Sequence, residues 1–142
     1  MTETIFKMNS ISKTLEEISN LKKKEERVEA LVKNGHYSLK MILKGMFDPN
    51  VKFLLPEGEP PYKPNMYDEP KALLNEVSRF YLLVEGGNPN LKQIKRENIF
   101  ISMLENVSPN DAKLLIAMKD KKSPYKNITE DLVRSVFPEL FQ

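Results

Sequence analysis

The chain has 142 residues, enough for one domain with a single core, and its 40% hydrophobic and 30% charged residues are typical of a globular protein. It contains no cysteine and one histidine, which excludes disulfides, thiolate nucleophiles and metal sites built from cysteines or several histidines. Its 22 basic and 20 acidic residues leave a net charge of +2, so any binding of nucleic acid would depend on local positive charge.

The sequence indicates neither a membrane-spanning segment nor a secretory signal. It lacks an apolar run of the roughly 18 residues that a transmembrane helix needs. Residues 1–7 lack the apolar stretch and the small-residue cleavage site of a signal peptide. We therefore expect a cytoplasmic protein that makes no contact with a membrane.

Three short helices are predicted over the first third of the chain, because apolar residues recur there at helical spacing. The first follows a serine cap at Ser10 or Ser12, the second spans 21–33 and the third spans 38–47. His36, at the start of the third helix, is expected to be exposed or to cap that helix. The residues expected to face the core are Ile11, Leu15, Ile18, Val28, Leu31, Val32, Leu39, Ile42, Leu43 and Met46.

The irregular segment 51–67 contains four prolines, so we expect an extended or polyproline-like backbone. It is longer than most loops of a compact domain, which indicates either a function or a long crossing of the surface. Two interpretations stay open. The segment could be a docking strip in which Pro60, Pro61 and Tyr62 meet an aromatic groove on a partner, or it could be a rigid strap that covers the core.

Two further helices are predicted in the second half, one from Pro70 to the Gly86-Gly87 pair and one over 91–105. Gly86-Gly87 follows a helix rather than a strand, so it indicates a helix end and not a phosphate-binding loop. The residues expected to face the core are Leu73, Val77, Phe80, Val84, Leu91, Ile94, Ile101 and Leu104.

Two capped helices frame a lysine-rich loop near the C-terminus. Ser108 and Asp111 form a variant of the capping box at the start of a helix that ends at Lys119, and Asn127 with Glu130 starts the last helix. No segment reads as a convincing strand. The predicted fold is therefore all-α, one domain over residues 1–142 with about seven short helices and one long proline-rich loop.

Lysines and arginines cluster at three places that could contact phosphates. The lysines of the loop after Lys119 could contact phosphates together with backbone N–H groups at the start of the following helix. Alternatively, they could be ordinary solvent-exposed side chains of a lysine-rich loop. Those of helix 91–105 share the face opposite its apolar stripe, where a solvent face is expected. The third cluster, 22–27, mixes both signs and indicates self-compensating surface pairs. The candidate DNA-binding residues are Lys119, Lys121, Lys122, Ser123, Lys126, Lys92, Lys95 and Arg96.

The chain ends in Leu140, Phe141 and Gln142. A terminal Leu-Phe pair could dock into a hydrophobic pocket on a partner, or the same two side chains could close the core beneath the first helices. No pair of nucleophile and base, no metal cluster and no nucleotide loop is present, so we expect no enzyme activity, no metal and no cofactor.

Two stretches of the sequence resemble a known family. Residues 18–31 and 39–43 with the aromatic-proline segment form the first stretch, and residues 111–120 and 132–140 form the second. Together they resemble the N-terminal α-helical DNA-binding domain of ATP-dependent DNA ligases, particularly the compact version in ligases of T-even-like phages. The whole chain is also similar to an uncharacterised family of small proteins in T4-like tailed phages, which implies the cytoplasm of an infected bacterial cell.

In the ligase family the second stretch is a helix, a basic loop that meets the DNA backbone, and a helix that ends in aromatic-proline. Lys119-Asp120 matches the start of that loop and Phe137-Pro138 matches the end. The loop glycine of the family is absent, and the Lys-x-Asp-Gly adenylation motif occurs nowhere in the chain. The resemblance thus implies binding of DNA without sealing of nicks.

Two functions follow as hypotheses. The first is a non-catalytic accessory protein of a phage that grips the backbone of double-stranded or nicked DNA with little sequence preference. The second is a protein–protein adaptor or inhibitor of a host or phage replication, transcription or defence protein. Its contacts would be Pro60, Pro61, Tyr62, Leu140 and Phe141.

Overall fold

The computed structural model describes residues 9–141, and within them the architecture is all-α, as the sequence predicts. The only strand-like feature of these residues is one antiparallel bridge between Phe53 and Val84. No helix of the described part is both long and apolar enough to cross a membrane. The α-helices and the 3-10 helices (η) are α1 (Ile11–Ser19), α2 (Lys24–Lys33), α3 (Tyr37–Phe47), α4 (Ala72–Glu76), η2 (Val77–Leu83), α5 (Gln93–Asn106), α6 (Pro109–Lys119), α7 (Glu130–Val136) and η3 (Pro138–Phe141).

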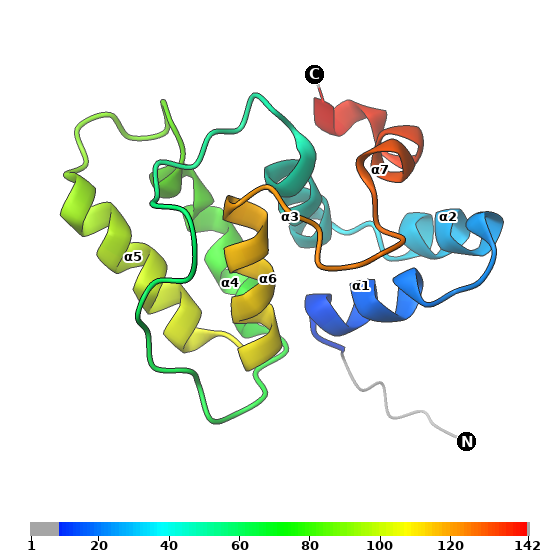
Figure 1. Ribbon diagram of the computed structural model, residues 1–142, viewed down its shortest axis with the longest axis horizontal. Helices are drawn as coiled ribbons and strands as arrows, with labels where there is room; N and C mark the ends of the chain where they lie inside the picture. Colours follow the sequence, from blue (N-terminus) through cyan, green and yellow to red (C-terminus); the bar gives the residue numbers. More distant parts are fainter. Residues whose placement is uncertain (1–8, 142) are drawn as a thin grey trace.

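Helix α3 lies at the centre of the molecule, between α6 and the helices α2 and α7 (Figure 1). Its predicted inward residues are all buried, and one hydrophobic core continues from α1 to η3. Gly45 lets α3 and α6 approach closely, because a Cβ at this position would lie 2.9 Å from the sulfur of Met118 and 3.1 Å from the ring of Phe53. A larger residue at this position would force the side chains of Met118 and Phe53 to move.

The predicted starts of the first and third helices are confirmed, whereas α2 begins at Lys24 and not at residue 21, and one residue was assigned to the wrong face. Ser10 accepts a hydrogen bond from the N–H of Lys13 and caps α1, and His36 accepts one from the N–H of Leu39 and caps α3. Val32, which was expected in the core, is 62% exposed. Successive helical residues point about 100° apart, and the inward position of α2 is taken by its neighbour Leu31.

The single long helix predicted from Pro70 is wrong. The chain forms the short α4 and then the 3-10 helix η2, and it becomes extended at Val84. Segment 51–67 causes this early ending, since the carbonyl of Leu83 accepts a hydrogen bond from Leu54 N–H at 2.8 Å and the N–H of Glu85 donates to the carbonyl of Lys52 at 2.8 Å. These groups are consequently unavailable for continuing an α-helix.

Segment 51–67, which we call the strap, passes over α6 and α5 on its way to α4 (Figure 1). Phe53, Leu55 and Tyr62 pack against the core. The backbone is fixed along its length, since Leu54 carbonyl accepts from Gln93 at 2.7 Å and Lys63 N–H donates to Glu105 at 2.8 Å. These contacts favour the covering-strap interpretation. Of the residues proposed for docking, Pro60 and Tyr62 are partly buried and Pro61 is exposed.

A buried ion pair holds the strap to the end of α6. The ammonium of Lys119 contacts Asp120 at 2.6 Å and donates to the carbonyl of Gly58 at 2.7 Å, while the Gly58 N–H donates to the Asp120 carboxylate at 3.2 Å. Gly58 has a φ of +92°, a conformation that glycine adopts without strain. The Lys119-Asp120 pair therefore clamps both polar groups of one strap residue.

The terminal leucine and phenylalanine belong to the fold. Leu140 is 4% exposed, and its carbonyl accepts a hydrogen bond from the ammonium of Lys44 at 2.7 Å. Phe141 packs against the core and lies 4.1 Å from the guanidinium of Arg134. These contacts favour the second of the two interpretations of this pair, because the C-terminal turn packs on α3 and α7 and closes the core there.

The ion pair at the strap leads to a prediction about stability. Lys119→Met should lower the free energy of unfolding by roughly 3 kcal/mol, because it leaves the Asp120 carboxylate buried without its cation. Lys122→Met is the matched control: Lys122 lies 3.9 Å from Glu57 and both side chains are largely exposed, so its loss should change stability by less than about 1 kcal/mol. Urea denaturation of both variants measures the two effects. Equal losses would contradict the clamp.

Candidate nucleic-acid interface

The eight residues predicted to contact DNA lie in different surroundings. Arg96 was expected on the solvent face of its helix and is instead buried. Its guanidinium donates to the carbonyl of Leu82 at 3.0 Å and to the side chain of Gln93 at 2.6 Å. Further hydrogen bonds at 3.4 Å join the guanidinium to the carbonyls of Asn88 and Leu91. Arg96 therefore pairs with carbonyls at the end of η2 and in the turn that follows it.

The predicted face of helix α5 is wrong in its first half. Ile94, expected in the core, is 71% exposed, whereas Leu104 is buried as predicted, together with Arg96, Phe100 and Met103. Lys92 and Lys95 remain exposed near the start of α5. This end of α5 lies at the opposite side of the view from α1 and α2, and the loop that follows α6 runs toward α1 and α2 (Figure 1).

Lysines of the loop after α6 also turn inward. Lys119 is buried in the clamp on Gly58. Lys121 occupies the left-handed position that ends α6, with a φ of 59°, and the N–H groups of Lys121 and Lys122 bond back to Met118 and Ala117 as in a Schellman motif. These first residues of the loop therefore terminate the helix and fasten it to its neighbours.

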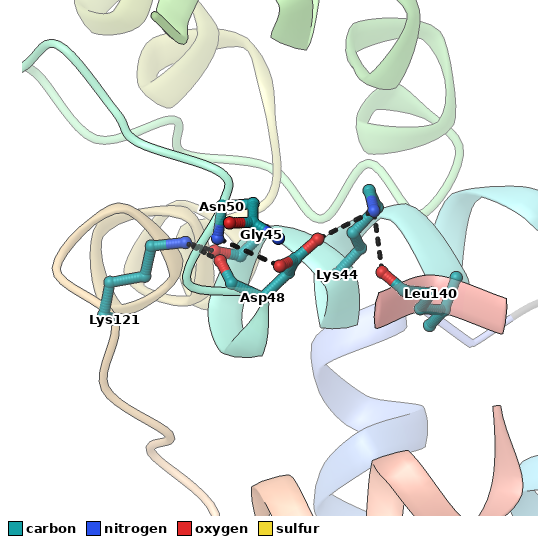
Figure 2. A network of polar contacts seen from close by, with 6 residues as sticks. All are labelled: Lys44, Gly45, Asp48, Asn50, Lys121 and Leu140. Atoms are coloured by element: carbon teal, nitrogen blue, oxygen red, sulfur yellow. Dashed lines mark hydrogen bonds and ion pairs between the residues drawn. The ribbon is translucent and has the colours of Figure 1, made fainter. Parts of the chain in front are cut away.

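The ammonium of Lys121 donates to the carbonyls of Gly45 at 2.6 Å and Asp48 at 2.9 Å, at the C-terminal end of α3 (Figure 2). Burial lowers the pKa of Lys121. The Asp48 side chain is buried in the same network: burial alone would raise its pKa, but hydrogen bonds from Lys44 and the N–H of Asn50 hold that pKa below its ordinary value. Lys121 therefore supports α3, where the last carbonyls of the helix need donors.

The other three predicted residues of the loop, Ser123, Lys122 and Lys126, face different surroundings. Ser123 closes the loop internally, because its hydroxyl donates to the carbonyl of Ile128 at 2.7 Å. Lys122 is exposed and lies 3.9 Å from Glu57 of the strap. Lys126 is also exposed and points to a different region, a large cleft between the loop, α1, α6 and the end of the strap. Only Lys126 of the eight predicted residues lines this cleft.

The cleft has a volume of about 1170 Å³ and is lined mainly by polar side chains. Five cationic side chains and two carboxylates contribute to its walls, together with the exposed asparagines Asn20 and Asn110 and with four serines that are almost completely buried. The cationic residues are Lys13, Lys22, Arg27, Lys113 and Lys126, and the acidic ones are Glu16 and Asp68.

The lysines of the cleft come from separate parts of the chain. Lys13 lies on α1, Lys22 on the α1–α2 turn and Lys113 on α6, and all are exposed, as is Lys126. Within residues 9–141 none of these four ammonium groups lies within 4 Å of a carboxylate. Their charge is therefore directed to the cleft and to solvent instead of to internal ion pairs.

Arg27 has a structural role at the same wall. Its guanidinium donates to the carbonyls of Leu21 at 2.7 Å and Lys22 at 3.3 Å, which fixes the turn that presents Lys22. Asp68 is likewise engaged, because its carboxylate accepts a hydrogen bond from the hydroxyl of Ser108 at 2.7 Å. Ser108 also accepts from the N–H of Glu69 at 2.6 Å, so the predicted capping box at the start of α6 is not formed.

A buried polar seam joins the elements that form the cleft. The Asp111 carboxylate, on α6, accepts a hydrogen bond from Ser12 N–H at 3.0 Å, in the first turn of α1. Tyr125 donates to the carbonyl of Ser12 at 3.2 Å, and Asn127 donates to the carbonyl of Ser19 at 2.6 Å. The loop is thus held along α1, and the walls of the cleft are fixed relative to one another.

Sequence reasoning missed most of this cleft. Lys13 and Lys113 are isolated charges on separate helices, and Lys22 belongs to the mixed run that was interpreted as surface pairs. The signal that could have found them is indirect. Asp111 was expected to cap its own helix, and only its pairing with Ser12, 99 positions away, shows that α1 and α6 meet here.

The fold and the cleft define an all-α domain with a lysine-rimmed polar cleft between its first helix and the start of α6. The chain belongs to a family of unknown function (DUF6433), whose model matches residues 14–124. The match includes the helices from α1 to α6 apart from the first three residues of α1. No curated protein and no solved structure matches the chain.

The seam predicts how stability depends on pH. Burial, together with the nearby Asp68, raises the pKa of Asp111 above its ordinary value of 3.8, although hydrogen bonds from Ser12 act in the opposite direction. Above pH 3.8 the folded protein therefore retains a proton that the unfolded chain has lost, and this contribution to stability disappears as the pH rises through the raised pKa. The variant Asp111→Asn keeps a carbonyl oxygen that can accept the hydrogen bond from Ser12 N–H, but its side chain cannot ionise.

The measurement is the free energy of unfolding of both proteins from about pH 4 to pH 7. Relative to Asp111→Asn, the wild-type protein should become less stable as the pH rises over this range. A difference between the two proteins that stays constant with pH would contradict the raised pKa, whatever the absolute stability of the variant.

Proposed function

We propose that this protein is a non-catalytic DNA-binding accessory protein that holds the phosphate backbone in the lysine-rimmed cleft. The observation that carries the proposal is the convergence of Lys13, Lys22, Lys113 and Lys126 on one cleft from four separate segments. Ammonium groups that neutralise phosphates release condensed counterions, which supplies most of the affinity of sequence-independent binding.

The other groups of the cleft suit the same ligand. The side-chain amides of the exposed Asn20 and Asn110 can donate hydrogen bonds to phosphate and sugar oxygens. A volume of about 1170 Å³ is above the range of about 300–1000 Å³ that is typical of sites for small molecules. Lysine carries a point charge on a flexible stem, so these contacts would position a strand without reading its sequence.

The proposed activity is the DNA binding that the sequence suggested, but the residues proposed to contact the DNA are different. Lys126 is retained; Lys119, Lys121 and Arg96 are assigned to the fold, because their cationic groups donate to backbone carbonyls. As part of the same proposal, the protein acts in the cytoplasm of an infected bacterial cell, where the resemblance to small proteins of T4-like tailed phages would place it.

The alternative proposal, an adaptor or inhibitor of a replication, transcription or defence protein, would need a different surface from the predicted one. Leu140 is buried and the strap is hydrogen-bonded along its length. The large hydrophobic side chains that are exposed outside the cleft within residues 9–141 are Val32, Tyr37, Tyr81 and Ile94. They lie on different helices and turns, whereas the cleft combines charge, size and fixed walls, so the DNA-binding proposal is the better supported one.

Fluorescence anisotropy with a labelled duplex at several salt concentrations tests the proposal. Four contacts should give a slope of log affinity against log salt of about −4, since each neutralised phosphate contributes about −0.9. Lys113→Gln/Lys126→Gln should reduce that slope to about −2. Lys92→Gln/Lys95→Gln is the matched control, because it removes the same charge from exposed lysines outside the cleft.

Three results would reject the proposal. These are absence of binding to both duplex and single-stranded DNA at low salt, a binding constant that does not respond to salt, and an equal effect of the two double variants. The last of these would mean that general surface charge, and not the cleft, attracts the DNA.

A further inference from the structure

The end of the strap places two exposed nonpolar side chains beside the lysines. Met66 is 84% exposed and Tyr67 is 68% exposed, and both line the cleft. Single exposed apolar side chains are common on protein surfaces; these two are distinguished because they are adjacent and lie in the wall of the cleft. The exposed aromatic ring of Tyr67 thus lies in the same cleft as the four exposed lysines.

The backbone around these two residues is fixed. Tyr67 N–H donates to the side chain of Asn65 at 3.0 Å, and the Asn65 amide donates to the carbonyl of Asn106 at 3.3 Å. On the other side, Glu69 N–H and the Asp68 carboxylate both bond to the hydroxyl of Ser108. The ring of Tyr67 is therefore presented by a short segment that is tied at both ends, so little conformational entropy is lost when a ligand covers it.

Aromatic rings beside lysines are the combination that binds single-stranded nucleic acid. The cationic groove follows the backbone while bases stack on the rings, and the stacking tolerates any sequence because every base has a flat face. In an intact duplex the bases stack on one another, so an exposed ring at the edge of a cleft has no base to contact. A double helix would therefore leave Tyr67 without a role.

We infer that the cleft takes an unpaired DNA strand, with one base stacked on Tyr67 and the adjacent phosphates at the lysines. This inference rests on the proposed function and names its substrate: single-stranded DNA, or the frayed strand at a nick or end. Met66, next to Tyr67, provides a polarisable surface for the same or a neighbouring base.

Binding of a labelled oligothymidylate and of a duplex by wild type, Tyr67→Ala and Tyr67→Phe is the first test. The wild type should prefer the single strand, and Tyr67→Ala should weaken its binding by at least about fivefold, the lower end of the range for base stacking. Tyr67→Phe keeps the flat ring and should bind like the wild type. The loss in Tyr67→Ala should persist at high salt, because stacking is not screened as phosphate contacts are.

A spectroscopic test asks directly whether a base covers the ring. The chain contains no tryptophan, so Tyr67→Trp introduces a single reporter at the cleft. Its fluorescence should be quenched by oligothymidylate and remain nearly unchanged with the duplex. Tyr37→Trp is the matched control, because Tyr37 is also 68% exposed and does not line the cleft; its fluorescence should respond to neither ligand.

The results separate this inference from the function on which it rests. Equal binding of single strand and duplex, unaffected by Tyr67→Ala but weakened by Lys113→Gln/Lys126→Gln, would overturn the single-strand inference and leave backbone binding in place. Quenching of both tryptophan variants alike would also overturn it. Absence of binding to either DNA at low salt would overturn both.

Discussion

The cleft depends on one buried polar contact, the hydrogen bond at 3.0 Å from Ser12 N–H in the first turn of α1 to the Asp111 carboxylate on α6. The second oxygen of this carboxylate is buried without a hydrogen-bond partner among residues 9–141. Burial of this carboxylate costs free energy that the hydrogen bond from Ser12 partly offsets, so the contact favours a position of α1 in which its free N–H groups meet α6. That position in turn brings Lys13 opposite Lys113 and gives Tyr125 and Asn127 the carbonyls to which they bond.

The opposite end of α6 shows why lysines near helix ends are difficult to assign from sequence. The last carbonyls of a helix need donors, and a long cationic side chain can reach the end of a neighbouring helix as readily as a phosphate. The ammonium of Lys121 donates to the carbonyl of Gly45 near the end of α3, and that of Lys119 donates to the carbonyl of Gly58 in the strap. The contact of Lys119 is buried, as is that of Arg96 at η2, whereas Lys121 remains partly exposed. Some basic residues that cluster in the sequence are thus used for assembly, whereas the cleft combines Lys22 and Lys126 from two such clusters with the isolated Lys13 and Lys113.

The all-α class and the faces of α1 and α3 could be predicted because each of these helices buries one regular stripe, as Leu39, Ile42 and Leu43 do. The prediction failed where distant segments intervene. The strap takes backbone groups from η2, and the guanidinium of Arg96 occupies the inward position of α5 that the apolar pattern had assigned to Ile94. The cleft could be predicted only through Lys126, because its other lysines meet through tertiary contacts that no local pattern encodes.

The low net charge of the chain is compatible with selective binding in the cleft. Five cations against two carboxylates give the cleft a larger positive excess than the +2 of the entire chain, so the rest of the molecule carries no positive excess of its own. A polyanion is then attracted to one region, and charge elsewhere does not compete for it. Stacking on Tyr67 adds an attraction that salt does not screen. A protein with so little total charge could in this way hold an unpaired strand while binding weakly to duplex DNA, which is the larger competitor in a cell.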